Sequence, residues 1–232
     1  DDQPFDAVFD TVIIANGARS ELRPKAWVMI DKPYPWGAKW TIVPECLTLE
    51  AKILHQFYDK SKIMMGILPT GATPTAHNQR LSSVFWSMPT DQLRNFLQDN
   101  QSRSDWLKVV SKRWKPAAEW LEQVIANPEE KQQWFAANYR DVVMSKFGEG
   151  RIGVLGDAAH AMSPQLGQGA NMALLDAWAL GQAVEISKNN NSIDHVKLWQ
   201  TYHQHRQSST AFYQFLSRLL TPLYQSDLWW AG

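Results

Sequence analysis

The stretch Gly150-Arg-Ile-Gly-Val-Leu-Gly-Asp-Ala-Ala-His160, followed at once by Ala161-Met-Ser-Pro-Gln-Leu-Gly-Gln-Gly-Ala-Asn171, decides how this chain folds. Its first part, residues 151–155, is a short apolar run of the kind that forms a buried strand. Gly156 lets the chain turn where that strand ends, and the carboxylate of Asp157 then stands at the exit. An ionised carboxylate in this place can accept a hydrogen bond from a hydroxyl group of a ligand.

The second half of the stretch predicts an anion site at the start of a helix. Gly167 and Gly169 precede or open a helix that we expect over residues 169–187. Glycine has no Cβ, so backbone N–H groups can approach a ligand closely, and the helix N-terminus carries partial positive charge. The helix is apolar around most of its circumference, with only Asp176 and Glu185 as charges, so we expect it to be packed inside a layered α/β domain.

Taken singly, a Gly-Asp turn and a Gly-Gln-Gly helix start are ordinary structural features. In this order and spacing they closely resemble the GD motif of the group A FAD-dependent monooxygenases of the para-hydroxybenzoate hydroxylase type. In that family Gly-Asp-Ala-Ala-His is followed by a proline and then by Gly-x-Gly-x-Asn at a helix start. The resemblance implies that the motif's Asp binds a ribityl hydroxyl of FAD and that residues 164–171 border the isoalloxazine ring. The implied cofactor-binding residues are Gly156, Asp157, Pro164, Gly167, Gln168, Gly169, Ala170 and Asn171.

A second motif lies near the start of the chain. Residues 9–15 predict a buried strand that ends in a turn at Asn16-Gly17, and Ala18-Arg-Ser-Glu-Leu-Arg23 follows. This stretch resembles the DG motif of the same family, whose usual form after a strand is Ala-Asp-Gly-Ala-x-Ser-x-Val-Arg and which serves FAD and NAD(P)H binding. Asn16 stands where Asp is usual, which removes a charge but keeps a short polar side chain suited to a turn. The resemblance adds Asn16, Gly17 and Arg19 to the cofactor-binding residues.

Composition excludes several classes of function. The 23 acidic and 23 basic residues balance, which gives no electrostatic case for binding nucleic acid or an anionic membrane surface. No apolar run approaches the length of a membrane span, and the first residues lack the features of a signal peptide. The single cysteine, Cys46, and the absence of metal-ligand spacing favour a cytoplasmic protein without zinc. The 12 tryptophans indicate either aromatic core packing or an aromatic-lined cavity.

Between the two motifs the sequence predicts an antiparallel sheet with helices outside it. Short connections between successive strands favour antiparallel pairing, and capping residues open the helices. On the last strand, Tyr139 and Arg140 precede the GD motif and are candidates to line the substrate site or to serve the structure alone. We expect strands at residues 27–30, 39–43, 54–58, 62–68, 81–86 and 133–144, a surface loop at 69–74, and helices at 90–97, 104–110 and 117–126.

The end of the chain predicts a second long helix. Residues 189–191 break the preceding helix, and Ser192 is expected to cap a helix that runs to about Leu220. Its two histidines, His203 and His205, are two residues apart and therefore point to different sides of the helix rather than jointly at a metal.

The resemblance implies an α/β (α+β) fold that is part of the para-hydroxybenzoate hydroxylase-like FAD-binding fold. Residues 1–23 would belong to the FAD-binding domain, 24–149 to a substrate-binding sheet domain, and 150–232 to the GD motif and C-terminal helices. The family needs a Gly-x-Gly-x-x-Gly loop for the ADP pyrophosphate well before the DG motif, and no such loop precedes residues 9–23 here. The match to this pattern at residues 148–153 lies directly before the GD motif, not at the first strand-to-helix turn. We therefore expect a fragment that lacks the N-terminal dinucleotide-binding element; the alternative is a small complete protein that serves as a binding module.

The activity implied by the resemblance is that of an FAD-dependent, NAD(P)H-using monooxygenase that hydroxylates an aromatic or similar small organic substrate with O2. An isoprenoid reductase or a halogenase of the same fold is the alternative among flavin enzymes, although the Trp-x-Trp-x-Ile-Pro signature of halogenases is not present. No residue is assigned as a catalytic acid or base. The fragment alone is expected to be inactive.

Overall fold

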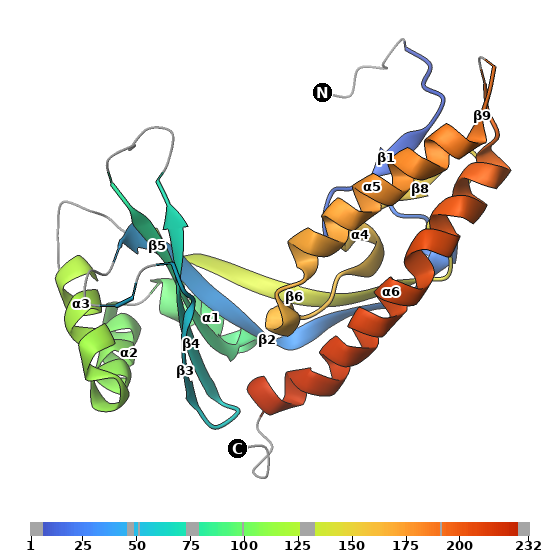
Figure 1. The fold of residues 1–232 in the computed structure, drawn as a ribbon. Helices are drawn as coiled ribbons and strands as arrows, with labels where there is room; N and C mark the ends of the chain where they lie inside the picture. The colour runs from blue at the N-terminus through green and yellow to red at the C-terminus, as the bar shows by residue number, and fades with distance from the viewer. Residues whose placement is uncertain are drawn as a thin grey trace. The chain divides into compact units, whose positions relative to one another are not determined.

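The computed structural model describes residues 7–45, 49–50, 52–72, 79–98, 100–125, 133–190 and 192–226 (Figure 1). The chain forms two compact units, each built from segments that are distant in the sequence. Unit 1 comprises Asp1–Pro33 and Tyr139–Leu220, and unit 2 comprises Tyr34–Asn138 and Thr221–Gly232. Cys46 lies outside the described residues.

Unit 1 contains a three-stranded sheet in the order β1-β8-β7, formed by β1 (Val12–Ile14), β8 (Ile152–Val154) and β7 (Gly148–Glu149). The strands β1 and β8 run parallel, with Val12 opposite Ile152 and Ile14 opposite Val154. Both strands occur where the sequence predicts them but are shorter, because only three residues of each take part in the pairing. The segments that carry the two sequence motifs are therefore neighbours in one sheet.

Four helical segments follow β8: α4 (Asp157–His160), the 3-10 turn η2 (Pro164–Leu166), α5 (Gly169–Ser187) and α6 (His195–Tyr224). The helix α5 has the predicted bounds, whereas α4 was not predicted. The prediction that Ser192 caps the last helix is wrong, because Ser192 lies in β10 (Ser192–Ile193), which pairs with β9 (Lys188–Asn189). Asp194 caps α6 instead, since its carboxylate accepts a hydrogen bond of 3.0 Å from the Lys197 N–H. The helix also continues four residues past the predicted end.

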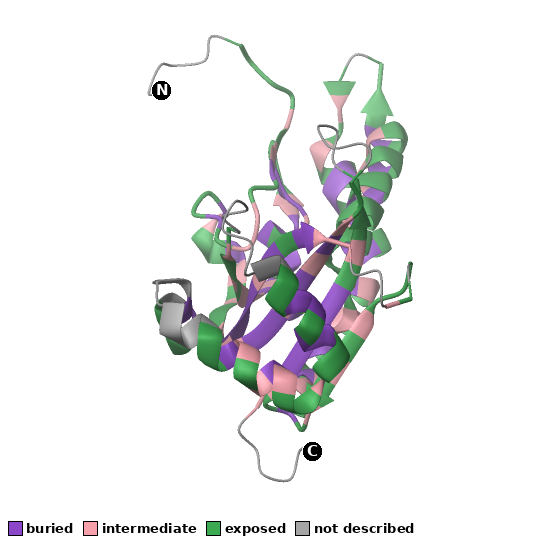
Figure 2. Cartoon of the chain, turned by 90° about the vertical axis from the view of Figure 1, so that its left-hand side faces the viewer, coloured by how far each residue is buried: buried purple, intermediate pink, exposed green. Residues whose placement is uncertain are grey.

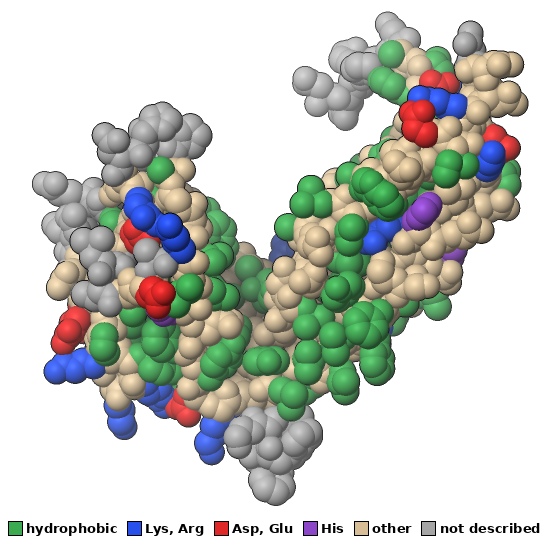
Figure 3. Space-filling view, viewed as in Figure 1, with side chains coloured by type: hydrophobic (Ala, Val, Ile, Leu, Met, Phe, Trp, Pro, Cys, Tyr) green, Lys and Arg blue, Asp and Glu red, His purple; other side chains and the backbone are tan. Residues whose placement is uncertain are grey.

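The prediction that α5 is packed inside the domain is wrong for the part of the chain that the structure describes. Its buried side chains fall on one stripe, at Met172, Asp176, Ala179, Ala183 and Ser187. On the opposite side Leu174 is 71% exposed and Trp178 is 59% exposed. Figure 3 shows hydrophobic side chains gathered on the outer face of α5 and α6. Apolar composition alone did not distinguish the inward stripe from this outer face.

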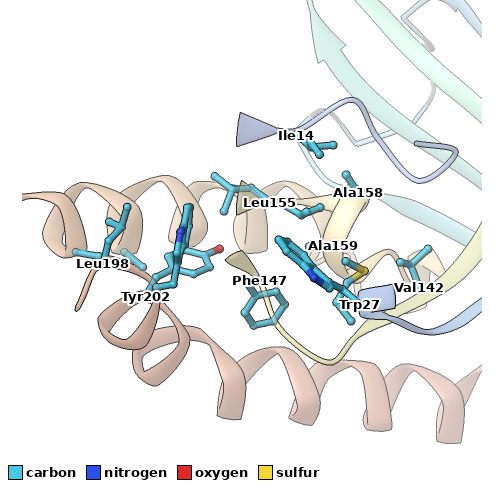
Figure 4. Close-up of a cluster of buried hydrophobic side chains, with 14 of the residues drawn as sticks. Ile14, Trp27, Val142, Phe147, Leu155, Ala158, Ala159, Leu198 and Tyr202 are labelled. Carbon is cyan, nitrogen blue, oxygen red and sulfur yellow. The ribbon is translucent and has the colours of Figure 1, made fainter. Parts of the chain in front are cut away.

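The core of unit 1 lies between the sheet, α4 and the two long helices. Figure 4 shows members of this core that come from the GD segment and from elements before and after it in the sequence, among them Ile14, Trp27, Val142, Phe147, Leu155, Ala158, Ala159, Leu198 and Tyr202. Trp199 packs flat on the β7–β8 hairpin, where a Cβ on Gly148 or Gly153 would lie 2.1 Å from its indole ring. Glycine at both positions therefore lets α6 approach the sheet closely.

A five-stranded sheet has the order β3-β4-β5-β2-β6. The pairs β2–β5, β3–β4 and β4–β5 are antiparallel, which confirms the predicted pairing. The strands are β2 (Val28–Pro44), β3 (His55–Asp59), β4 (Ile63–Gly71), β5 (Leu81–Pro89) and β6 (Phe135–Met144).

Two strand predictions are corrected. The expected strands at residues 27–30 and 39–43 form one continuous strand, β2, while Trp27 itself ends the 3-10 turn η1 (Lys25–Trp27). Pro33 and Pro35 lie between the two expected strands, but pairing with β5 begins only at Trp36, so the β2–β5 ladder requires no N–H from either proline. The expected loop at residues 69–74 begins as strand, because β4 continues to Gly71, and residues 73–74 lie outside the described residues.

Three helices, α1 (Thr90–Gln98), α2 (Asn100–Arg113) and α3 (Lys115–Ile125), pack on one face of this sheet. Figure 2 shows the buried residues of the strands and helices in purple and the exposed ones in green. The helix α2 begins before Ser104, which is therefore not its cap, and Pro116 lies in the first turn of α3, where its missing N–H is tolerated. Several tryptophans fill the core beneath the helices. The rings of Trp86 and Trp106 pack edge to face, with 5.7 Å between their centroids.

Candidate functional site

The parallel pairing of β1 and β8 places Asn16-Gly17 and Gly156-Asp157 at the same edge of the sheet. Each pair follows the carboxyl end of its strand, and a hydrogen bond of 3.0 Å from the Leu155 N–H to the Ile14 carbonyl extends the ladder toward them. Ligands of α/β proteins bind at such carboxyl ends. The structure thus brings the two sequence motifs together in space, entirely within unit 1.

Gly156 makes the turn out of β8 in a backbone conformation that only glycine adopts readily, with φ 58° and ψ −145°. The next residue, Asp157, begins α4 and is exposed. Its side chain is therefore accessible to a ligand at the end of the strand. Asn16 and Arg19, from the other motif, are also exposed.

The start of α5 has the features expected of an anion site. Gly167 has φ 62° and ends η2, and a Cβ added to Gly167 or Gly169 would meet no atom within 4 Å. The Met172 N–H donates to the Gln168 carbonyl at 2.8 Å, so the three preceding N–H groups have no carbonyl partner within the helix. The Asn171 side chain donates to the Gln168 side-chain oxygen at 2.8 Å, which fixes both amides at the helix start.

Arg23 links the segment after β1 to α4. Its Nε donates to the Ser20 carbonyl at 2.9 Å, its Nη1 donates to the Ala158 carbonyl at 3.1 Å, and its Nη2 donates to the Ala18 carbonyl. Arg23 is buried, so these bonds satisfy its guanidinium in the protein interior. The DG-like motif and the GD motif are therefore joined by side-chain bonds as well as by strand pairing.

A buried ionic network lies behind the site, and the sequence analysis did not identify it. Asp176 of α5 is 1% exposed. Its Oδ2 accepts from the Gly156 N–H at 2.7 Å and from the His160 Nε2 at 2.6 Å, and its Oδ1 accepts from the Arg206 Nε at 2.6 Å. Because an ionised carboxylate only accepts hydrogen bonds, the proton between His160 and Asp176 belongs to Nε2.

The protonation of Asp176 follows from these contacts. Burial acts to raise the pKa of Asp176, but the hydrogen bonds from His160, Arg206 and Gly156 outweigh burial and hold that pKa below its ordinary value. Burial raises the pKa of the neighbouring Tyr202, which therefore stays neutral. One signal could have revealed the network: Asp176 shares an inward stripe with Met172 and Ala179, and a carboxylate on a buried face needs partners.

The candidates for substrate contact, Tyr139 and Arg140, lie on β6. The Arg140 Nη2 forms an ion pair of 2.6 Å with the Asp31 carboxylate. Tyr139 is half-buried, and burial raises its pKa to about 12, so its hydroxyl is protonated at neutral pH. Their role in lining a substrate site stays a prediction.

His203 and His205 of α6 do not face a common point. The ring centroid of His203 lies 5.5 Å from that of Phe147, and the ring centroid of His205 lies 6.0 Å from that of Trp178. The two histidines therefore lie on different sides of α6, as expected. Among the described residues, no group of three His, Cys, Asp or Glu side chains could hold a metal ion. In the same part of the chain, no helix combines the length and apolar character needed to cross a membrane.

The family of the chain is established by comparison with known proteins. The model of the FAD binding domain family matches residues 12–212, a range that includes both strand ends and all of α5. The chain belongs to this family of FAD-binding monooxygenases.

Two relatives are similar over parts of the chain. The 3-hydroxybenzoate 6-hydroxylase of Polaromonas naphthalenivorans is 33% identical over 116 residues, which are 46% of this chain and 28% of that protein. A stretch of 33 residues is 64% identical to 2-heptyl-3-hydroxy-4(1H)-quinolone synthase of Pseudomonas aeruginosa, covering 14% of this chain and 9% of that protein. Each match covers less than a third of the relative's length.

Solved structures share the fold. PqsL, a probable FAD-dependent monooxygenase from Pseudomonas aeruginosa, superposes with a TM-score of 0.73 at 18% identity, covering 93% of this chain and 56% of that one. Klebsiella pneumoniae HpxO, crystallised with FAD and uric acid, gives a TM-score of 0.67 at 19% identity, covering 94% of this chain and 52% of that one. The predicted fold class is confirmed, and the chain spans about half the length of these structures.

Proposed function

We propose that the whole protein is an FAD-dependent monooxygenase that consumes NAD(P)H and O2 and hydroxylates a small aromatic or similar organic substrate. The observation that carries the proposal is the meeting, in unit 1, of two motif-bearing strand ends beside the open N-terminus of α5. Family membership supports the cofactor, while the reductant, the substrate and the reaction are inferred.

The residues at this edge fit FAD. Asp157 offers an exposed carboxylate that can accept a hydrogen bond from a ribityl hydroxyl. The first turn of α5, from Gly169 to Asn171, offers backbone N–H donors and the positive end of the helix to the electron-rich edge of the ring. Because no atom lies within 4 Å of the positions where Cβ atoms would stand on Gly167 and Gly169, a planar ring can approach the backbone there.

When bound, FAD supplies the redox chemistry with O2, and the residues described here bind and orient it. The exposed guanidinium of Arg19, next to the turn after β1, suits a phosphate group of the reductant. Gly156 and Asp157 would hold the ribityl chain, and Pro164 to Asn171 would border the ring. The positive end of α5 favours the reduced, negatively charged state of the ring over the oxidised state.

The proposed substrate class is aromatic. The relatives just compared include a hydroxybenzoate hydroxylase and a quinolone synthase, whose names describe aromatic rings. Tyr139 keeps its proton at neutral pH and can donate a hydrogen bond to a substrate oxygen. The guanidinium of Arg140, which pairs with Asp31, can also donate to a substrate carboxylate. Both residues remain proposals for substrate contact.

The test uses the whole protein with FAD, NADH or NADPH, and a panel of hydroxybenzoates and quinolones. The expected result is that one panel member stimulates oxidation of the reduced nicotinamide and gains one oxygen atom from ¹⁸O₂. Oxidation of the nicotinamide that saturates an isoprenoid double bond, or that places halide on the ring, would instead establish one of the alternative activities. A protein that binds no flavin would contradict the proposal as a whole.

A further inference from the structure

The buried carboxylate of Asp176 connects two parts of the candidate flavin site that the chain presents separately. One part is the turn at Gly156-Asp157, and the other is the N-terminus of α5. Asp176 lies on α5 about two turns after that N-terminus, and its Oδ2 accepts the Gly156 N–H at 2.7 Å. This bond ties the turn directly to the helix.

We propose that Asp176 is a positioning residue that fixes the Gly156-Asp157 turn relative to the start of α5, so that both can contact one flavin molecule. The proposal rests on the proposed function for its ligand. Asp176 is buried and touches no ligand itself, and it acts through Asp157, the residue next to its hydrogen-bond donor.

The backbone geometry at Gly156 explains why such a restraint is needed. Glycine adopts this φ and ψ readily, but it has many other conformations open to it, so the turn keeps this one only where a contact selects it. A 2.7 Å bond from the Gly156 N–H to a charged acceptor is a strong contact of this kind. Without it the turn can relax, and the direction in which the Asp157 side chain leaves the strand changes with it.

The other partners of Asp176 explain why a carboxylate serves here. Three donors converge on its two oxygens, from Gly156, His160 and Arg206. An amide of the same size has one accepting oxygen and would point its own N–H groups at donors. Arg206 balances the buried charge and also donates to the Met172 carbonyl at 3.2 Å, which holds α6 against α5.

The central experiment is a double-mutant cycle on FAD affinity in the whole protein, with Asp157→Ala, Asp176→Asn and the double variant. We expect Asp176→Asn to weaken FAD binding by on the order of tenfold to a hundredfold, as for other groups that orient a ligand-binding side chain. In the Asp157→Ala background the same change should weaken binding by less than about threefold, since the residue it positions is gone. Glu185→Gln, at an exposed position of the same helix, is the matched control and should leave FAD affinity unchanged.

A second measurement needs no flavin. Amide hydrogen exchange of the flavin-free protein should become faster at Gly156 in Asp176→Asn and stay unchanged in Glu185→Gln. If Asp176→Asn does not fold, Arg206→Lys replaces it in both measurements, because it keeps the positive charge but loses the fork that binds Asp176 and the Met172 carbonyl.

The outcomes separate the two proposals. Equal losses of FAD affinity from Asp176→Asn with and without Asp157 would overturn the positioning role, and so would unchanged exchange at Gly156. If Asp157→Ala leaves FAD affinity intact, the flavin site is wrongly assigned, while faster exchange at Gly156 would still show that Asp176 restrains the turn.

Discussion

The Nη1 of Arg23 donates a hydrogen bond of 3.1 Å to the carbonyl oxygen of Ala158, joining the segment after β1 to the helix that begins with Asp157. Two further bonds from the same guanidinium hold the backbone of its own segment. One buried side chain thus fixes the relative position of the two motifs that define the candidate site.

Replacing Arg23 by Met should lower the stability of the protein substantially. Three carbonyl groups would lose a charged donor in a buried environment, which we expect to cost about 3 kcal/mol or more. The urea-denaturation midpoint measures the effect. Arg19→Met, in the same segment but exposed, is the control and should change stability by less than about 0.5 kcal/mol. Equal effects of both substitutions would argue against the bonds described here.

Two glycine substitutions should separate ligand contact from packing. Gly169→Val places its side chain where no protein atom lies within 4 Å, so we expect little change in stability but about tenfold weaker FAD binding, or roughly 1.4 kcal/mol. Gly153→Ala drives a methyl group into the Trp199 ring and should cost about 1–3 kcal/mol of stability. Thermal unfolding and flavin titration of both variants check this. Unchanged FAD affinity in Gly169→Val would remove the start of α5 from the site.

The stabilising effect of the Asp176 network should disappear in acid. The pKa of Asp176 is lower in the folded protein than in the unfolded chain, so its stabilisation is fully present above the unfolded value, about 4, and is lost as pH falls through the folded value. The basic side chains of Arg206 and His160 both face Asp176, at 2.6 Å from its two carboxylate oxygens. Denaturation of the protein and of Asp176→Asn between pH 3 and pH 7 should give a difference that is constant near neutrality and shrinks below about pH 4.

The chain of residues 1–232 by itself should bind FAD only weakly. In enzymes of this type a Gly-x-Gly-x-x-Gly loop between a strand and a helix holds the pyrophosphate of the ADP half. The match to that pattern at residues 148–153 lies in the β7–β8 hairpin instead. The groups at Asp157 and at the start of α5 reach only the other half of the cofactor, and each 1.4 kcal/mol of lost contact weakens binding about tenfold. The visible spectrum of the purified chain decides the matter. Stoichiometric bound flavin would show that the contacts described here suffice.

Local patterns predicted the elements whose ends carry distinctive residues. The bounds of α5 were predictable because glycines mark its start, and the strand before Gly156 was predictable from its apolar run. The short connections between strands of the middle region likewise predicted the antiparallel pairs of the five-stranded sheet. That the two motif segments are neighbours was implied by the family resemblance, not by their spacing.

The errors arise where a distant partner determines the structure. Pro33 and Pro35 do not interrupt β2, and the register with β5 leaves both outside the β2–β5 ladder. The apolar surface of α5 gave no indication of which side would face α6. The partners of Asp176 come from three separate elements, so no local window contains them. For the assigned cofactor residues the structure gives positions and accessibility, and their binding roles await the experiments above.

The pairing of Val12 with Ile152 also affects how the protein is made. On the ribosome β1 emerges long before β8, with most of unit 2 between them. Closing a long loop costs conformational entropy, and a folded insertion lowers that cost by bringing its own ends closer together. We therefore expect the two strand ends to meet late, after the five-stranded sheet has formed. Substitutions that slow folding of that sheet would then delay cofactor uptake even though they lie in another part of the chain.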